Sequence, residues 1–226
     1  MPKDSLKYNL FRSNRKTYAL EVSPSGTLTV RVPNHYSDIE VSDIITRHRN
    51  WIEQNVVKTK RKIEKAGLDK FFKNKQVFFR GDLLDVMVII TNKNKVELSK
   101  DRLIVYKREN IETKKLITNW LKERARDLFT EKLNHFSNTF GLSYQSLKLS
   151  NAKKRWGSCS SKKNINLSWR LVMAEDILID SVILHELAHT VHMNHSSDFY
   201  DLLSRMNPDY LKHDVMIRDR FYLLNY

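Results

Sequence analysis

Hydrophobic and polar positions alternate with a period of two over several stretches of the chain. This pattern predicts β-strands, because successive side chains of a strand point to opposite faces. Residues 16–22 and 27–32 are two such stretches, and the turn sequence Pro24-Ser25-Gly26 between them predicts a β-hairpin. The other predicted strands are residues 76–79, 83–91, 95–98, 102–106, 145–150 and 164–169. Short polar turns separate the four strands between residues 76 and 106, so we expect an antiparallel meander there.

Elsewhere, apolar residues recur at spacings of three and four, which predicts amphipathic helices. One helix is predicted to begin near Ser42, a suitable N-cap, and to end near Gly67. A second, over residues 110–139, ends before Gly141 and carries an apolar stripe. The stripe consists of Leu116, Trp120, Ala125, Leu128, Phe129, Leu133 and Phe136. Further helices are predicted over residues 175–192, around residues 199–206, and from Pro208 toward the C-terminus.

This mixture of helices and short strands predicts an α+β fold. No linker rich in Gly, Ser or Pro interrupts the elements, so we expect two lobes that pack as one unit. Residues 1–108 are predicted to form an N-terminal β-rich lobe with one long helix. Residues 109–226 are predicted to form a second lobe, in which the helix over residues 175–192 lies beside a small antiparallel sheet.

The helix over residues 175–192 contains the sequence His185-Glu186-Leu187-Ala188-His189. Residues four apart share a helix face, so His185 and His189 can bind one metal ion, and Glu186 can direct its carboxylate at a water on that ion. H-E-x-x-H is the zincin signature, with two zinc ligands and a general base. Such short motifs also arise by chance, and a helical histidine can be a core residue. The apolar lead-in, residues 177–184, favours the metal site, because a buried carboxylate without a partner is costly.

A catalytic zinc site needs a third protein ligand and an open position, and His192 and His195 are the candidates. On a straight helix His192 would lie about 10 Å along the axis from His185. Metal–nitrogen bonds of about 2.0–2.1 Å do not easily bridge that distance. Met193-Asn194 can end the helix and let the chain turn back, so His195 is the predicted third ligand. Three imidazoles favour one Zn2+ ion, although other divalent transition metals could bind.

This donor set predicts hydrolytic chemistry. Glu186 would take a proton from the metal-activated water and pass it to the leaving group, while the water attacks a carbonyl or phosphoryl centre. A strand edge beside the metal could align an extended peptide, and residues 164–169 are the candidate strand.

The chain has 226 residues, with 40 Lys and Arg against 26 Asp and Glu, and its formal net charge is +14. That excess favours anionic partners such as nucleic acid or nucleotides, and simple solubility is an equally good explanation. The single cysteine, Cys159, excludes an internal disulfide and fits a reducing compartment. The first residues contain no apolar signal segment, and no apolar run approaches about 18 residues, so we expect a cytoplasmic protein without a membrane span.

Several segments around the histidines carry a resemblance to a known family. They are Lys154–Ser160, Ile165–Leu171, Ile179-Asp180, Val182, His185–His189, Asn194-His195-Ser196 and Phe199. Together they closely resemble the YgjP-like metallopeptidase family, which is similar to the SprT-like and WLM proteases. The Pro-Ser-Gly hairpin, the helix around Trp51 and the hairpin at Gly81 extend the resemblance to nearly the full chain. The sequence departs from the family at Glu175, Ser181 and Tyr200, none of which is an inferred ligand.

The resemblance implies a zincin fold and metal-dependent hydrolysis, and the H-E-x-x-H-x5-H spacing of the lineage supports His195. It leaves the substrate open. SprT-like and WLM proteins cleave DNA- or ubiquitin-linked proteins, whereas members of the YgjP-like group have been associated with hydrolysis of nucleoside triphosphates such as UTP. Possible substrate-binding residues are Arg155, Trp156, Asn166 and Tyr200. Cys159 is interpreted as a small buried residue rather than a reactive thiol, and His192 as a residue behind the ligands or on the surface.

Three hypotheses follow, in order of preference. The first is a zinc metallopeptidase that cleaves peptide or protein substrates bound along residues 164–169. The second is a metal-dependent nucleoside triphosphate phosphohydrolase with a basic pocket at Arg155. The third is a non-catalytic, nucleic-acid-associated module that keeps a structural metal. Glu186 argues against the third, because a structural metal site needs no base.

Overall fold

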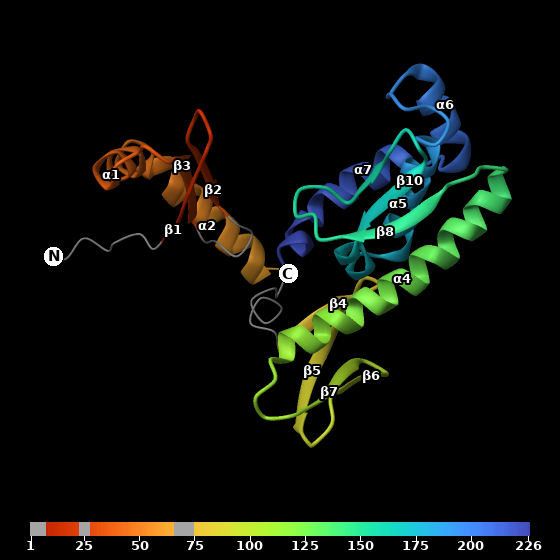
Figure 1. Cartoon of the computed structure of the whole chain (residues 1–226), viewed down its shortest axis with the longest axis horizontal. Helices are drawn as coiled ribbons and strands as arrows, with labels where there is room; N and C mark the ends of the chain where they lie inside the picture. Colours follow the sequence, from red (N-terminus) through yellow and green to blue (C-terminus); the bar gives the residue numbers. More distant parts are fainter. Residues whose placement is uncertain (1–7, 23–27, 66–74) are drawn as a thin grey trace. The chain divides into compact units, whose positions relative to one another are not determined.

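The computed structural model describes residues 8–22, 28–65 and 75–226 (Figure 1). Its contacts divide the chain into two compact units, residues 1–72 and 73–226. The sequence suggested a boundary after residue 108. The observed division falls earlier, because strands between residues 76 and 107 contact helices of the second unit. That the lobes pack as one unit stays a prediction.

The first unit contains a three-stranded sheet and two helices. Its elements are β1 (Tyr8–Ser13), β2 (Ala19–Val22), β3 (Leu28–Pro33), α1 (Asp38–Arg47) and α2 (Arg49–Lys65). The strand order is β1-β3-β2, with β1 parallel to β3. β2 and β3 are antiparallel, so the predicted hairpin is confirmed; its turn, Pro24-Ser25-Gly26, lies outside the described residues. The core of the unit consists of Leu28, Val30, Val32, Val41, Ile44 and Ile52.

The helical part of this unit begins earlier than Ser42, where the sequence analysis placed it. Ser37 is the N-cap, and its Oγ accepts a hydrogen bond from the backbone N–H of Glu40 at 3.3 Å. The Glu40 carboxylate accepts in return from the backbone N–H of Ser37 at 2.8 Å. This capping box, Ser-x-x-Glu, was the stronger start signal. α1 ends before His48, so one predicted helix is two, and the predicted end at Gly67 lies outside the described residues.

The second unit begins with a four-stranded sheet. It consists of β4 (Gln76–Phe79), β5 (Asp82–Ile90), β6 (Lys95–Ser99) and β7 (Arg102–Lys107). The predicted antiparallel meander is wrong, because the strand order is β4-β5-β7-β6 and β5 is parallel to β7. β7 lies at an inner position of the sheet, and its residues Leu103 and Val105 are fully buried, whereas β6 at the edge is partly exposed.

The rest of the second unit is arranged along a long helix, α4, drawn in green in Figure 1. The elements are α4 (Thr113–Phe140), β8 (Ser146–Ser150), β9 (Gly157–Cys159), β10 (Asn164–Ser168), η1 (Trp169–Met173), α5 (Asp176–Ala188), α6 (Ser197–Met206), α7 (Tyr210–Asp219) and η2 (Phe221–Asn225). α4 contacts β6 and β7 as well as β8, η1 and α5, and thus joins the two sheets. Ala125, Phe129 and Leu133 of its predicted stripe are fully buried. Gly141 ends the helix in a left-handed conformation, φ 64°, as expected.

The sheet of β8, β9 and β10 is mixed rather than antiparallel. β10 lies in the centre, parallel to β8 and antiparallel to β9. The chain passes from β8 to the far side of the sheet as β9, and β10 then inserts between them. The prediction that residues 164–169 offer a free edge is therefore wrong, because β10 is paired on both sides. β8 and β9 are the two edge strands of this sheet. The α+β class itself is confirmed.

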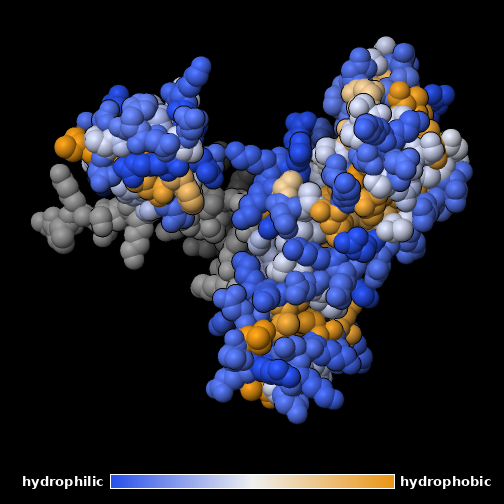
Figure 2. Space-filling view, viewed as in Figure 1, coloured by the Kyte–Doolittle hydropathy of each residue, from blue (hydrophilic) through white to orange (hydrophobic). Residues whose placement is uncertain are grey.

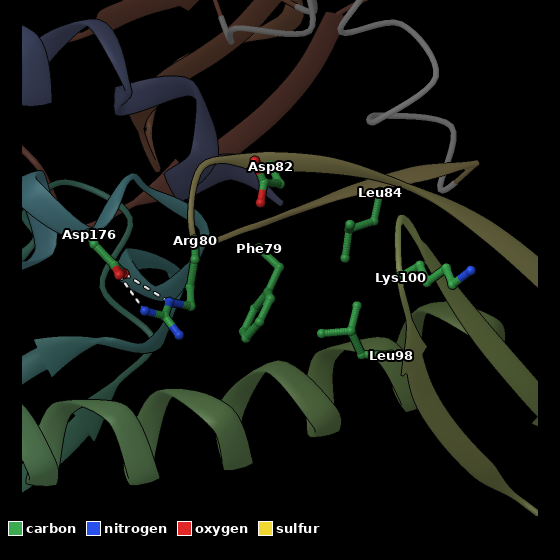
Figure 3. A pocket seen from close by; sticks show the side chains of 7 residues that line it. All are labelled: Phe79, Arg80, Asp82, Leu84, Leu98, Lys100 and Asp176. Carbon is green, nitrogen blue, oxygen red and sulfur yellow. Dashed lines mark hydrogen bonds and ion pairs between the residues drawn. The ribbon is translucent and has the colours of Figure 1, made fainter.

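α5 carries the H-E-x-x-H sequence and ends at Ala188 rather than at residue 192. The turn between β4 and β5 holds its first residues. Arg80 donates two hydrogen bonds to the carboxylate of Asp176, one of them from Nε at 2.9 Å (Figure 3). The backbone N–H of Gly81 donates to the carbonyl of Met173 at 3.2 Å. The four-stranded sheet is thus attached directly to η1 and to the start of α5.

Most of the surface visible in Figure 2 is hydrophilic, and hydrophobic residues are visible around the sheet of β4 to β7. The exposed hydrophobic residues of β5 are Met87, Val88, Ile89 and Ile90. Among the described residues, no helix is long and apolar enough to cross a membrane.

Candidate metal centre

Three histidines meet at the end of α5. His185 lies in the last turn of α5, His189 is its C-cap, and His195 comes from the segment before α6. Each offers a ring nitrogen, and these nitrogens lie within 4.8 Å of one another. The Nε2 atoms of His185 and His195 are 3.2 Å apart. The structure therefore brings together the three residues that the sequence analysis predicted as ligands, and they could hold a metal ion.

The early end of α5 explains how His195 reaches the other two rings. The helix stops one residue before His189, whose Nδ1 lies 3.0 Å from the backbone carbonyl of His192. A proton on Nδ1 makes this a hydrogen bond and keeps Nε2 available for a metal. His192 thus contributes its carbonyl rather than its ring. Ser196 then starts α6 by accepting a hydrogen bond from the N–H of Phe199 at 3.4 Å.

Phe199 supports all three imidazoles. Its side chain is fully buried. Its ring centroid lies 5.1 Å from that of His185, 4.5 Å from that of His189 and 4.8 Å from that of His195. A buried aromatic ring restricts the rotation of its neighbours, so Phe199 keeps the three rings facing one another.

His185 and His189 have the protonation state that a metal needs, and the spacing of the ring nitrogens also suits a metal. Burial, with the neighbouring rings of His189 and His195, lowers the pKa of His185 to about 4. Burial also lowers the pKa of His189, against the hydrogen bond to His192 that raises it. His185 and His189 are therefore neutral near pH 7, the form that binds metal. Two nitrogens on one tetrahedral zinc ion are about 3.3 Å apart, so the observed 3.2 Å fits.

Glu186 is buried beside the histidine cluster. It is 5% exposed, and its Oε2 has no hydrogen-bond partner among the described residues. Burial raises the pKa of Glu186 to about 8, while the positive charge of Arg155 opposes this rise. Such a carboxyl is costly unless a positive charge comes close. A divalent cation on the histidines would supply that charge, so the site fits the metal that the sequence predicts.

Glu186 packs directly on the edge strand β9. A β-carbon at Gly157 would lie 2.4 Å from Oε1 of Glu186, so any larger residue there would have to displace the Glu186 carboxylate. The carbonyl of Trp156 faces β10 and accepts a hydrogen bond from the N–H of Ser168 at 2.7 Å. Because backbone groups alternate in direction along a strand, those of Gly157 and Cys159 face away from β10. No strand among the described residues lies on that side, so β9 presents an edge next to Glu186.

A cavity of about 770 Å³ lies beside Glu186. Three of the predicted substrate-binding residues line it, namely Arg155, Trp156 and Tyr200. Trp156 is also buried, so it contributes to the core as well as to the cavity wall. Asn166 does not line the cavity, because it lies on the central strand β10.

One further wall of the cavity comes from α7 and η2, which the sequence did not connect with the site. Its residues are Tyr210, Leu211, Asp214, Ile217, Arg218 and Phe221. Their spacing of three and four residues is an amphipathic signal, but it does not say which neighbour the face covers. In the structure α7 contacts α5, which brings this face to the histidines.

Cys159 is half-buried in β9 and does not line the cavity. Burial raises the pKa of its thiol, and the carboxylate of Glu186 adds to the rise. A thiol that stays protonated near pH 7 is a poor nucleophile. This agrees with the interpretation of Cys159 as a packing residue.

Three histidines around one position, with a buried glutamate beside them, form the arrangement of a metal-dependent hydrolase. A family model described as YgjP-like, metallopeptidase domain, matches residues 16–219. The chain therefore belongs to the YgjP-like metallopeptidase family, and the resemblance noted in the sequence is confirmed. Searches of curated proteins and of solved structures found no match.

Proposed function

We propose that this protein is a zinc-dependent metallopeptidase with Glu186 as general base. Membership of the family supports metal-dependent hydrolysis. His185, His189 and His195 are the proposed ligands of one zinc ion, because their ring nitrogens converge on one point. The observation that favours a peptide as the substrate is the edge of β9 beside Glu186.

An extended peptide can add to β9 as a further strand. Gly157 and Cys159 direct their N–H and C=O groups away from β10, toward the position of such a strand. Because the Glu186 carboxylate is packed on Gly157, a peptide paired with Gly157 would hold one of its amide bonds next to that carboxylate. A nucleotide has no backbone that would use this edge.

The residues of the chain then divide the reaction between them. When bound, zinc supplies a Lewis acid for the attacking water and the scissile carbonyl. Glu186 takes a proton from that water, whose oxygen bonds to the carbonyl carbon, and delivers the proton to the amide nitrogen as the C–N bond breaks, which gives a carboxylic acid and an amine. The burial of Glu186 raises its affinity for the proton that it carries. The carbonyl of His192 keeps the ring of His189 in place.

A second candidate function is the hydrolysis of nucleoside triphosphates. Lys154 and Arg155 both line the cavity, and such cations can hold phosphate groups. The family resemblance also pointed to triphosphates such as UTP. This candidate ranks lower because it leaves the edge of β9 without a role.

The test compares the metal-loaded protein with Glu186→Gln on both substrate classes. We expect cleavage of unfolded proteins such as casein, loss of that activity with a chelator, and a fall of about 10²–10⁴-fold in Glu186→Gln. The same preparations are incubated with a panel of nucleoside triphosphates. Turnover of triphosphates alone would contradict the peptidase proposal. Salt-dependent DNA binding, without turnover of either substrate class, would favour the non-catalytic module instead.

A further inference from the structure

The cavity beside Glu186 has an apolar wall that the proposed reaction does not use. Val182 of α5, Leu203 of α6 and Ile217 of α7 are buried residues of this wall. Leu211 of α7 and Phe221 of η2 also line the cavity and are exposed. These side chains come from separate elements and converge on one space next to the general base. An apolar surface in that position can bind an apolar part of the substrate.

The charged residues of α7 leave this wall without net charge. Asp214 and Arg218 line the cavity and form an ion pair with each other, four residues apart on the helix. The other cations of the cavity, Lys154 and Arg155, belong to the segment that precedes β9. A charge of the substrate placed against Val182 and Ile217 would therefore lose its hydration without gaining a partner on this wall.

The cavity adjoins only one end of β9. Arg155, Trp156 and Gly157 line it, whereas Ser158 and Cys159 do not. A peptide that pairs antiparallel with β9 runs from Cys159 toward Gly157. The peptide bond to be cleaved is held near Gly157, next to Glu186. Beyond Gly157 the peptide continues toward the cavity, so the residue that enters the cavity lies on the carboxyl side of the cleaved bond.

We infer that this cavity makes the protein selective for a large apolar residue, such as leucine or phenylalanine, on the carboxyl side of the cleaved bond. The inference rests on the proposed peptidase function. The cavity has a volume of about 770 Å³, which is ample for such a side chain. Burying a leucine or phenylalanine side chain is favourable, whereas burying aspartate there is costly. We expect kcat/KM to be about 10- to 100-fold higher for leucine or phenylalanine than for serine or aspartate at this position.

The test uses the metal-loaded full chain and a set of peptides that differ only at this residue. Leu211→Asp places a carboxylate on the cavity wall, and Val215→Asp is the matched control. Both residues are on α7 and well exposed, 67% and 62% respectively, but only Leu211 lines the cavity. We expect Leu211→Asp to lose most of the preference for leucine and phenylalanine, mainly through a higher KM, and Val215→Asp to keep it.

The outcomes separate this inference from the proposed function. If no peptide is cleaved in a Glu186-dependent manner, the peptidase function is contradicted and the inference with it. If cleavage depends on Glu186 but all residues are accepted equally, or if the preference lies on the amino side of the bond, only the inference is overturned. An equal loss of preference in Leu211→Asp and Val215→Asp would overturn it as well, since that loss would not come from the cavity.

Discussion

Gly157 and Glu186 are in such close contact that a β-carbon at position 157 would lie 2.4 Å from Oε1 and 2.8 Å from Cδ of the carboxylate. The contact joins two parts of the chain with different proposed tasks. Gly157 belongs to the edge strand on which a peptide can pair, and Glu186 is the proposed base. A change in this contact would therefore shift the carboxylate relative to a peptide paired with β9.

The first prediction concerns this contact. Gly157→Ala should push the Glu186 carboxylate away from β9 and lower kcat by about 10²-fold, because an error of about 1 Å in the position of a reacting group has such an effect. Zinc content should not change, since the three atoms nearest to a β-carbon at position 157 all belong to Glu186 and none to a histidine. Peptide cleavage and zinc stoichiometry are measured on the same preparation. Ser158→Ala is the control, and a wild-type kcat in Gly157→Ala would contradict the proposed role of the contact.

The second prediction separates His195 from His192. His195→Ala removes a proposed ligand and should weaken zinc binding by more than about 100-fold. His192→Ala should bind zinc nearly as well as the wild type, because His192 acts through its backbone carbonyl, which alanine keeps. Competition with a chromophoric chelator gives both affinities. Equal losses in the two variants would show that the ring of His192 matters and that the assignment of the third ligand is wrong.

The sequence was sufficient for features that depend on local spacing. Four residues separate His185 from His189, so their common position on a helix followed from helix geometry alone. The prediction of His195 over His192 rested on the rise of a helix, the reach of a metal bond and the expected helix break at Met193-Asn194. Ser37 and Glu40 carry an equally local signal, the capping box, and the start of α1 was readable from it.

Features that depend on contacts between residues far apart in the chain could not be predicted from the sequence. The alternating patterns of β5 and β7 fit a parallel or an antiparallel partner equally well, so the order of that sheet could not be derived. The same holds for β10, whose central position depends on where β9 lies. Nothing near Gly157 in the sequence indicates that its missing side chain makes room for Glu186. The apolar residues of α7 recur at helical spacing, but the sequence did not show that this face of the helix packs against α5.

The third prediction concerns stability at the turn that holds α5. Gly81 has a φ of 90°, and a β-carbon there would lie 2.7 Å from Cγ of Glu175 and 3.2 Å from its Cα. Gly81→Ala combines backbone strain with this clash, so we expect a loss of about 2–4 kcal/mol in the free energy of unfolding. Gly141→Ala is the control, because Gly141 also has a positive φ but has open space around it; it should lose about 1–2 kcal/mol. Denaturant unfolding measures the loss of stability in both variants. Equal losses would show that the clash with Glu175 does not contribute.

The last prediction is a pH dependence at the same junction. The hydrogen bond from Arg80 holds the pKa of Asp176 below its usual range. A carboxyl whose pKa is lower in the folded state stabilises the fold fully above its unfolded pKa, about 3.9, and loses that contribution as the pH falls through the folded value. Asp176→Asn should therefore reduce the free energy of unfolding at pH 7, and the difference from the wild type should shrink below about pH 4.

The size of this difference is limited by solvent. The side chains of Arg80 and Asp176 are 46% and 39% exposed, so water and salt screen the pair and the contribution should stay under about 1 kcal/mol. It should also fall when the salt concentration rises. Asp101→Asn is the control, because the Asp101 side chain is 80% exposed and its contact with Arg102, at 3.5 Å, is longer than that of Asp176 with Nε of Arg80. Denaturant unfolding at pH 7 and at pH 3 measures the difference. A difference that grows toward acid pH has the wrong sign, and it would show that the carboxylate of Asp176 does not stabilise the junction through Arg80.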